Sequence, residues 1–91
     1  EAVSIRSVNL PAHFLRHDGN LVAFAPSDGS DAFAQSATWY LRPGLANEDW
    51  ISIEAYDQLG YYIGQQFDIV ALVQAANQAM REDATFERLD E

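Results

Sequence analysis

Residues 37–45 read Ala-Thr-Trp-Tyr-Leu-Arg-Pro-Gly-Leu, and the first three recur as Ala-Thr-Phe at residues 84–86, 47 positions later. Other segments recur 48 positions later: Ser4-Ile5 as Ser52-Ile53, Phe14-Leu15 as Tyr62-Ile63, and Leu21-Val22-Ala23-Phe24 as Ile69-Val70-Ala71-Leu72. Because order and apolar character are both kept, chance alternation is the weaker explanation. We therefore divide the 91 residues into repeat 1, about 4–49, and repeat 2, about 50–91.

Each repeat shows the short runs of alternating apolar and polar residues that are typical of β-strands. Turn-forming residues such as Asp18-Gly19-Asn20 and Pro43-Gly44 separate these runs. Strands are expected at residues 3–7, 13–17, 21–25, 38–41, 51–55, 61–65, 69–73 and 85–89. Only residues 74–83 look helical, and we expect a loop with one helical turn there. The sequence predicts an all-β protein built from two four-strand units.

Charge narrows the possible partners. The net charge of −9 comes from 14 acidic residues against five arginines and no lysine. Phosphate contacts need clustered Lys and Arg, so neither nucleic acid nor an anionic membrane surface is an expected partner. There is no cysteine, hence no disulfide or thiolate site. The chain begins at Glu1 and shows no signal peptide, so we expect a processed form or a piece of something longer.

The sequence contains no convincing pattern of catalytic or metal-binding residues. His13 and His17 lie four residues apart on one expected strand, which separates them by about 13 Å, too far to share a metal ion. Asp28 and Asp31 supply too few oxygens for a calcium cage, and we interpret them as turn formers. We expect no cofactor, no metal and no enzymatic activity in this chain.

Several motifs of repeat 1 occur together in one known family. They are Ser-Val-Asn-Leu-Pro at 7–11, Phe-Leu-Arg-His at 14–17, Asp-Gly-Ser at 28–30, Ala-Thr-Trp at 37–39 and Arg-Pro-Gly-Leu at 42–45. In this combination the chain resembles the arabinose-binding domain of α-L-arabinofuranosidase B, also called carbohydrate-binding module family 42. The resemblance covers nearly the whole chain. The Gln-x-Trp signature of ricin-type trefoils is missing.

The resemblance implies a β-trefoil of three repeats that is an accessory, non-catalytic part of a secreted glycoside hydrolase. Such a module binds arabinofuranosyl side chains of plant hemicellulose, in arabinoxylan or arabinan. This chain carries two of the three units, so we treat it as a single incomplete trefoil domain. Two units leave unpaired strand edges. We therefore expect either a homo-oligomer or a third repeat supplied by missing sequence.

The resemblance also implies sugar ligands: the His of the Arg-His strand and the Asp before Ala-Thr-Phe. Here that set is split, because repeat 1 has His17 but Ser36, whereas repeat 2 has Asp83 but Gln65. A carboxylate accepts two hydroxyl hydrogen bonds, and a neutral imidazole can donate or accept one. The candidate carbohydrate-binding residues are Asp83, His17, Gln65 and Tyr62.

Each candidate also has a structural interpretation. Asp83 could cap a turn, His17 could be a hydrogen-bonded strand-end histidine, and Gln65 could be a plain exposed strand residue. Of the neighbours Tyr61 and Tyr62, one should face outward, where it could meet a ligand. Two functions therefore stay open: an arabinose-binding module, or a degenerate copy with a structural or protein-interaction role.

The aromatic residues divide into two groups. Trp39 and Phe86 occupy the same repeat position, so both are expected in the core. Trp50 lies at the junction of the two repeats, where it could either pack or stack on a sugar.

Overall fold

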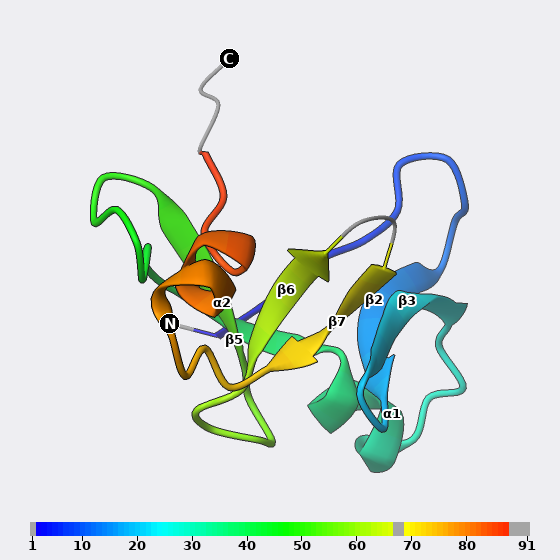
Figure 1. Ribbon diagram of the computed structural model, residues 1–91. Helices are drawn as coiled ribbons and strands as arrows, with labels where there is room; N and C mark the ends of the chain where they lie inside the picture. Colours follow the sequence, from blue (N-terminus) through cyan, green and yellow to red (C-terminus); the bar gives the residue numbers. More distant parts are fainter. Residues whose placement is uncertain (1, 67–68, 88–91) are drawn as a thin grey trace.

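The computed structural model describes residues 2–66 and 69–87 (Figure 1). The strands are β1 (Ala2–Ser4), β2 (His13–Asp18), β3 (Leu21–Pro26), β4 (Thr38–Pro43), β5 (Ile51–Ala55), β6 (Tyr62–Gln66) and β7 (Ile69–Val73); the helices are α1 (Asp31–Ser36) and α2 (Gln78–Asp83). These strands form one antiparallel sheet in the order β1-β4-β5-β6-β7-β3-β2. The all-β expectation is confirmed, with two short helices added.

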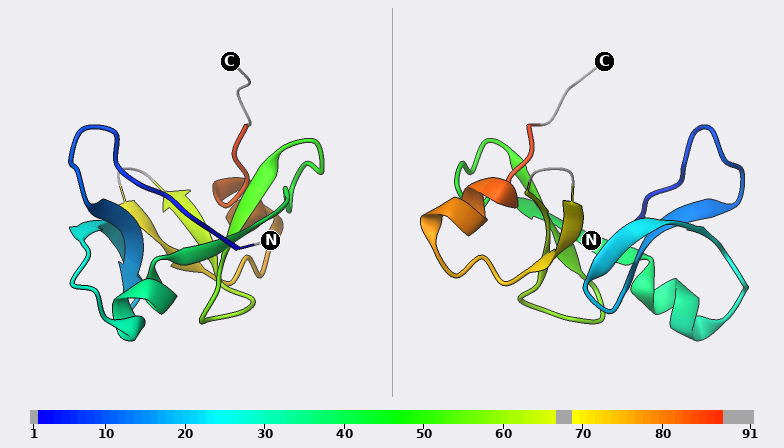
Figure 2. Two further views of the ribbon diagram at one scale, coloured as in Figure 1. Left: turned by 180° about the vertical axis from the view of Figure 1, so that it is seen from behind. Right: turned by 45° about the vertical axis from the view of Figure 1, so that its right-hand side comes forward.

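The two outer strands of this sheet, β1 and β2, are joined to each other. Just beyond β1, Arg6 forms an antiparallel bridge with Phe14, and the backbone N–H of Leu15 donates to the carbonyl of Ile5 over 2.8 Å. The sheet is thereby nearly closed into a barrel-like form, which Figure 2 shows from two sides. The open strand edges expected from two repeats are therefore paired within this part of the chain.

Backbone hydrogen bonds recur at equivalent positions of the two repeats. The N–H of Ser7 donates to the carbonyl of His13 over 2.9 Å, and 48 positions later that of Ala55 donates to Tyr61 over the same distance. The bridge of Arg6 with Phe14 corresponds in the same way to the pairing of Glu54 with Tyr62. The sequence repeat is thus a repeat of backbone contacts.

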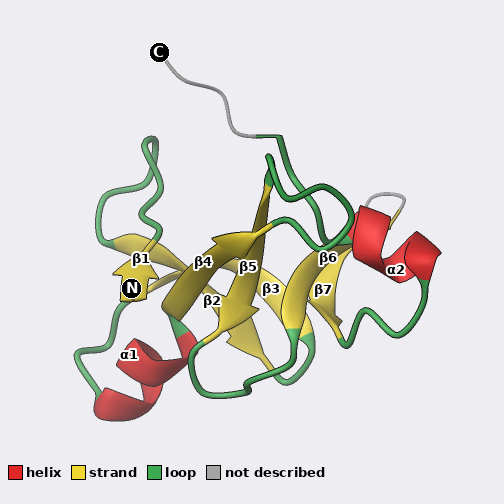
Figure 3. Ribbon diagram, turned by 90° about the vertical axis from the view of Figure 1, so that its left-hand side faces the viewer, coloured by secondary structure: helices red, strands yellow, loops and turns green. Residues whose placement is uncertain are grey.

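The helices α1 and α2 also occupy equivalent positions in the two repeats, although the sequence predicted only α2. Ser30 caps α1 by accepting from the N–H of Phe33 over 3.1 Å, and Asn77 caps α2 by accepting from Met80 over 2.9 Å. Helix α2 occupies only the second part of residues 74–83. Residues 31–36, expected to be irregular, form α1 because a six-residue helix shows no apolar periodicity and is signalled by its cap alone. Figure 3 shows α1 and α2 on opposite sides of the sheet.

The core lies inside the barrel around Trp39. This side chain is fully buried, and its indole N–H donates to the carbonyl of Leu15 over 3.0 Å, which satisfies its one polar atom. Buried residues from four other strands surround it: Val22, Ala55, Ile63 and Leu72 complete the cluster. Phe86 packs against the cluster, as expected from its repeat position.

The last expected strand, 85–89, falls partly outside the described residues. Within the described part, Phe86 forms an antiparallel bridge with Ile51. Among the helices of residues 2–66 and 69–87, neither is long and apolar enough to cross a membrane.

Candidate functional site

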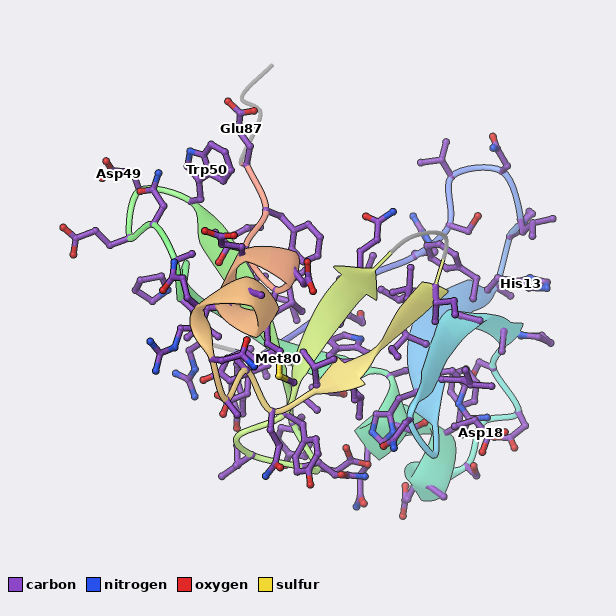
Figure 4. All side chains as sticks on the ribbon, viewed as in Figure 1. His13, Asp18, Asp49, Trp50, Met80 and Glu87 are labelled. Carbon is purple, nitrogen blue, oxygen red and sulfur yellow. The ribbon has the colours of Figure 1, made fainter. Side chains whose placement is uncertain are left out.

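A groove of about 300 Å³ runs between α2 and the outer face of β6 and β7. Its residues come from the two strands and the helix: Gly64, Ile69, Ala71, Val73, Asn77, Ala79, Met80 and Asp83. Figure 4 shows Met80 directed from α2 towards these strands. The floor is apolar, and the polar side chains are the N-cap Asn77 and Asp83 at the two ends of α2. Such a mixture suits a small ligand with both C–H and hydroxyl surfaces.

Asp83 is the ionisable group of this groove. It is the last residue of α2, and its side chain is half-buried. Within residues 2–66 and 69–87 its carboxylate forms no side-chain hydrogen bond or ion pair. A carboxylate in this position can accept hydroxyl hydrogen bonds from a ligand in the groove.

Gly64 lines the groove at a position that has no room for a side chain. Gly64 lies on β6 opposite Ala71 of β7, and Val73 lies two residues further along β7. A Cβ at position 64 would lie 2.8 Å from Cγ2 of Val73, so a side chain there would have to displace its neighbour. Glycine at this position is therefore required by the packing of β6 against Val73.

The equivalent place in repeat 1 holds a side chain. Arg16 aligns with Gly64, and its Nε–H donates to Oγ of Ser36 over 3.2 Å. Its guanidinium carbon lies 5.1 Å from the ring centroid of Phe33, within cation–π range. Ser36 and Phe33 align with Asp83 and Met80. Arg16 thus lies across the end of α1. It covers the place in repeat 1 that corresponds to the groove beside α2 in repeat 2.

His17 is engaged elsewhere. Its side chain is buried, its Nε2 lies 2.6 Å from Oδ1 of Asp57, and its Nδ1 lies 3.2 Å from the carbonyl oxygen of Gly19. The ring also meets Trp39 edge-on, with centroids 6.0 Å apart. The hydrogen bonds of Ser36 go to Arg16 and to the carbonyl of Phe33. The structure therefore gives His17 and Ser36 separate partners.

The two other predicted residues lie on opposite faces of β6. Gln65 is exposed and, by strand alternation, points away from the face that carries Gly64. Tyr62 shares that face and pairs with Glu54 and Val73 on the neighbouring strands. Burial raises the pKa of the Tyr62 phenol, the carboxylate of Glu54 raises it further, and Arg42 opposes both.

Of the four residues predicted from the sequence, Asp83 lines this groove, and the other groove residues were not among the candidates. The replacement of an arginine by Gly64 at a matched repeat position was a readable signal. No such signal in the sequence pointed to Asp57, because its partner His17 is 40 positions away. Asp28, interpreted as a turn former, accepts from both the N–H and the hydroxyl of Ser30, and these hydrogen bonds lower its pKa.

Comparison with known proteins agrees with this architecture. The family model of the α-L-arabinofuranosidase B domain matches residues 1–88. An arabinofuranosidase/B-xylosidase of Trichoderma koningii is 31% identical over 90 residues, and a probable α-L-arabinofuranosidase B of Aspergillus terreus is 33% identical over 91 residues. Each match covers 93% of this chain and 18% of the relative. The chain thus spans about a fifth of the length of these relatives.

Solved structures give the same result. A GH54 α-L-arabinofuranosidase soaked with a cyclic sulfate inhibitor superposes with a TM-score of 0.86 at 28% identity, over 96% of this chain and 19% of that one. An arabinofuranosidase complexed with arabinofuranosyl-α-1,2-xylobiose superposes with the same TM-score, identity and coverage. The resemblance found in the sequence motifs is confirmed. The chain belongs to the α-L-arabinofuranosidase B domain family.

Proposed function

We propose that this chain is a non-catalytic carbohydrate-binding module that recognises arabinofuranosyl groups in the groove between α2 and β6–β7. The observation that carries the proposal is the position of Asp83 in this groove, with an apolar floor opposite it. A furanose ring presents C–H surface to the floor and hydroxyls to the carboxylate. Family membership supports the choice of arabinofuranose over other small polar ligands.

The wider assignment follows from the relatives. Several carry arabinofuranosidase in their names, so the target is the arabinose-bearing polysaccharide of plant cell walls, arabinoxylan or arabinan. Because the chain spans about a fifth of these relatives, we place it as an accessory domain of a secreted glycoside hydrolase.

We also propose that a third repeat completes a β-trefoil, contributed by further sequence or by another copy of the chain. Support comes from apolar side chains at the loop tips, where Val8 is 98% exposed and Leu59 67% exposed. Contact with another repeat would remove this apolar surface from water. Light scattering of the isolated chain tests the proposal, since a stable compact monomer would contradict self-association.

Titration of the chain with arabinose-bearing oligosaccharides, followed through backbone NMR shifts, tests the sugar site. We expect shifts in α2 and at Gly64, with a dissociation constant in the millimolar range, roughly −4 kcal/mol. Asp83→Asn should weaken binding by about 1.5–3 kcal/mol, because a hydrogen bond to a charged acceptor is lost. Asp18→Asn, on the exposed end of β2, is the matched control and should bind as the parent does.

The contacts of repeat 1 favour a second function, that of a structural or protein-interaction module. Arg16 lies over Ser36, and His17 is engaged with Asp57. If the titration leaves the amides of α2 unmoved at high ligand concentration, a structural or protein-interaction module is the better description.

A further inference from the structure

The two tryptophans occupy contrasting environments. Trp39 is fully buried, whereas Trp50 is 40% exposed and lines a second groove of about 270 Å³ on the surface. Figure 4 shows Trp50 next to Asp49 on the loop before β5, with Glu87 above it. Trp50 therefore does not simply pack at the repeat junction, and its exposed indole face needs an explanation.

The loop that carries Trp50 is held by its own hydrogen bonds. The N–H of Trp50 donates to the carbonyl of Asn47 over 3.0 Å, and the N–H of Gly44 donates to the carbonyl of Trp50 over 2.9 Å. Oδ1 of Asn47 accepts from the N–H of Asp49 over 3.0 Å. The indole is thus presented by an ordered loop, which lowers the entropy cost of binding a ligand against it.

The polar residues around the indole define the ligand chemistry. Glu48, Asp49 and Arg42 line the same groove, so carboxylate acceptors and guanidinium donors stand beside an aromatic face. The Nε–H of Arg42 is engaged with Glu54 at 2.8 Å, and within residues 2–66 and 69–87 its terminal N–H groups form no hydrogen bond. Carboxylates at the rim repel anions. An aromatic face with hydroxyl-binding groups suits a neutral sugar ring.

The second groove is also connected to the end of α2. Two backbone hydrogen bonds of 2.7 and 2.8 Å join Ile51 and Phe86, and the N–H of Ala46 donates to Oγ1 of Thr85 over 3.0 Å. The antiparallel register of this bridge places Trp50 opposite Glu87, four positions after Asp83. The bridge thus joins the loop of Trp50 to the segment that follows α2.

We infer that Trp50 is a second saccharide-contact site, which stacks a neutral backbone sugar while the groove of Asp83 holds an arabinosyl branch. The inference of a backbone sugar rests on the proposed function. Stacking on Trp50 requires only an unbranched neutral chain. The two sites can therefore be tested with separate ligands.

The test uses xylohexaose, which has no arabinose, and arabinofuranosyl-α-1,2-xylobiose. Acrylamide quenching of fluorescence reports on Trp50, because Trp39 is shielded in the core. We expect xylohexaose to protect Trp50 from acrylamide and to shift the amides of residues 44–50, in the parent chain and equally in Asp83→Asn. Trp50→Ala should weaken calorimetric binding of xylohexaose about tenfold, and Trp50→Phe by less, since it keeps an aromatic face. Tyr56→Ala, which removes another exposed aromatic ring, is the matched control.

The outcomes separate the two sites. If neither oligosaccharide protects Trp50 while the branched one moves the amides of α2, the Trp50 site is refuted and the proposed function stands. If xylohexaose protects Trp50 but arabinofuranosyl-α-1,2-xylobiose leaves the amides of α2 unmoved, the Trp50 site is supported and the arabinose site is refuted. Protection only by a cationic peptide would refute a site for neutral sugars.

Discussion

Nε2 of His17 lies 2.6 Å from Oδ1 of Asp57, so a buried side chain of repeat 1 is hydrogen-bonded to the turn between β5 and β6 in repeat 2. A carboxylate only accepts, so Nε2 carries the proton in this bond. The contact lies beside the core, because the same imidazole meets Trp39 edge-on. It joins the two repeats where the resemblance alone implied a sugar ligand.

Asp57→Ala should therefore destabilise the fold. The imidazole of His17 would stay buried without an acceptor at Nε2, which costs about 1–3 kcal/mol in the free energy of unfolding. Urea denaturation followed by circular dichroism measures the change. Asp18→Ala, at an exposed position next to His17, serves as the control and should change stability by less than about 0.5 kcal/mol. Equal effects of the two substitutions would show that the contact contributes nothing.

Gly64→Ala should lower stability by about 1–3 kcal/mol, because the new Cβ would lie 2.8 Å from Cγ2 of Val73. Val73→Ala removes the atoms in conflict. We expect the double variant to be more stable than the sum of the two single effects predicts, which a thermodynamic cycle from urea denaturation detects. Strict additivity would show that the sheet accommodates the methyl group without strain from Val73.

Ala12→Gly should stabilise the chain. Ala12 has φ of 63°, and the residue 48 positions later is Gly60, with φ of 89°. A left-handed conformation costs a residue with a Cβ about 1–2 kcal/mol, although the greater freedom of glycine in the unfolded chain cancels part of the gain. Thermal unfolding should show a higher midpoint for Ala12→Gly. Ala23→Gly, in the middle of β3, should lower it.

Arg16→Ala should lower stability by about 1–2 kcal/mol, since it removes the hydrogen bond to Ser36 and the cation–π contact with Phe33. Arg16→Lys keeps the positive charge but loses the Nε–H donor and the planar guanidinium, so it should recover less than half of the loss. Full recovery by lysine in urea denaturation would mean that charge alone matters at this position. Arg81→Ala, on an exposed arginine of α2, controls for the change in net charge.

Tyr62 should make the stability of the fold fall at high pH. Its pKa is raised above the usual 10.0 by burial and by the nearby carboxylate of Glu54, so the folded chain keeps the phenolic proton after the unfolded chain has lost it. This contribution is complete below pH 10 and disappears as the pH rises through the folded-state pKa. Urea midpoints measured across this range should decline less steeply in Tyr62→Phe than in the parent. A parallel decline would exclude Tyr62, and Tyr56→Phe should behave like the parent.

The repeat and the all-β class could be predicted from the sequence because both depend on local pattern. Alternation of apolar residues determines which face of a strand is buried, and this worked for Trp39 and for the strands around it. The presence of Asp83 before Ala84-Thr85-Phe86 was likewise visible as a motif. Helix α1 was missed because six residues show no periodicity and depend on the single cap at Ser30.

The partners of the candidate residues were decided by the tertiary structure. His17 is drawn to Asp57 and Arg16 to Ser36 across 40 and 20 positions of sequence, because closure of the sheet brings these segments together. The groove is likewise tertiary, because it forms where α2 packs against β6 and β7. A sequence specifies which groups are available, and the distances between non-local groups decide which of them bind each other and which stay free for a ligand.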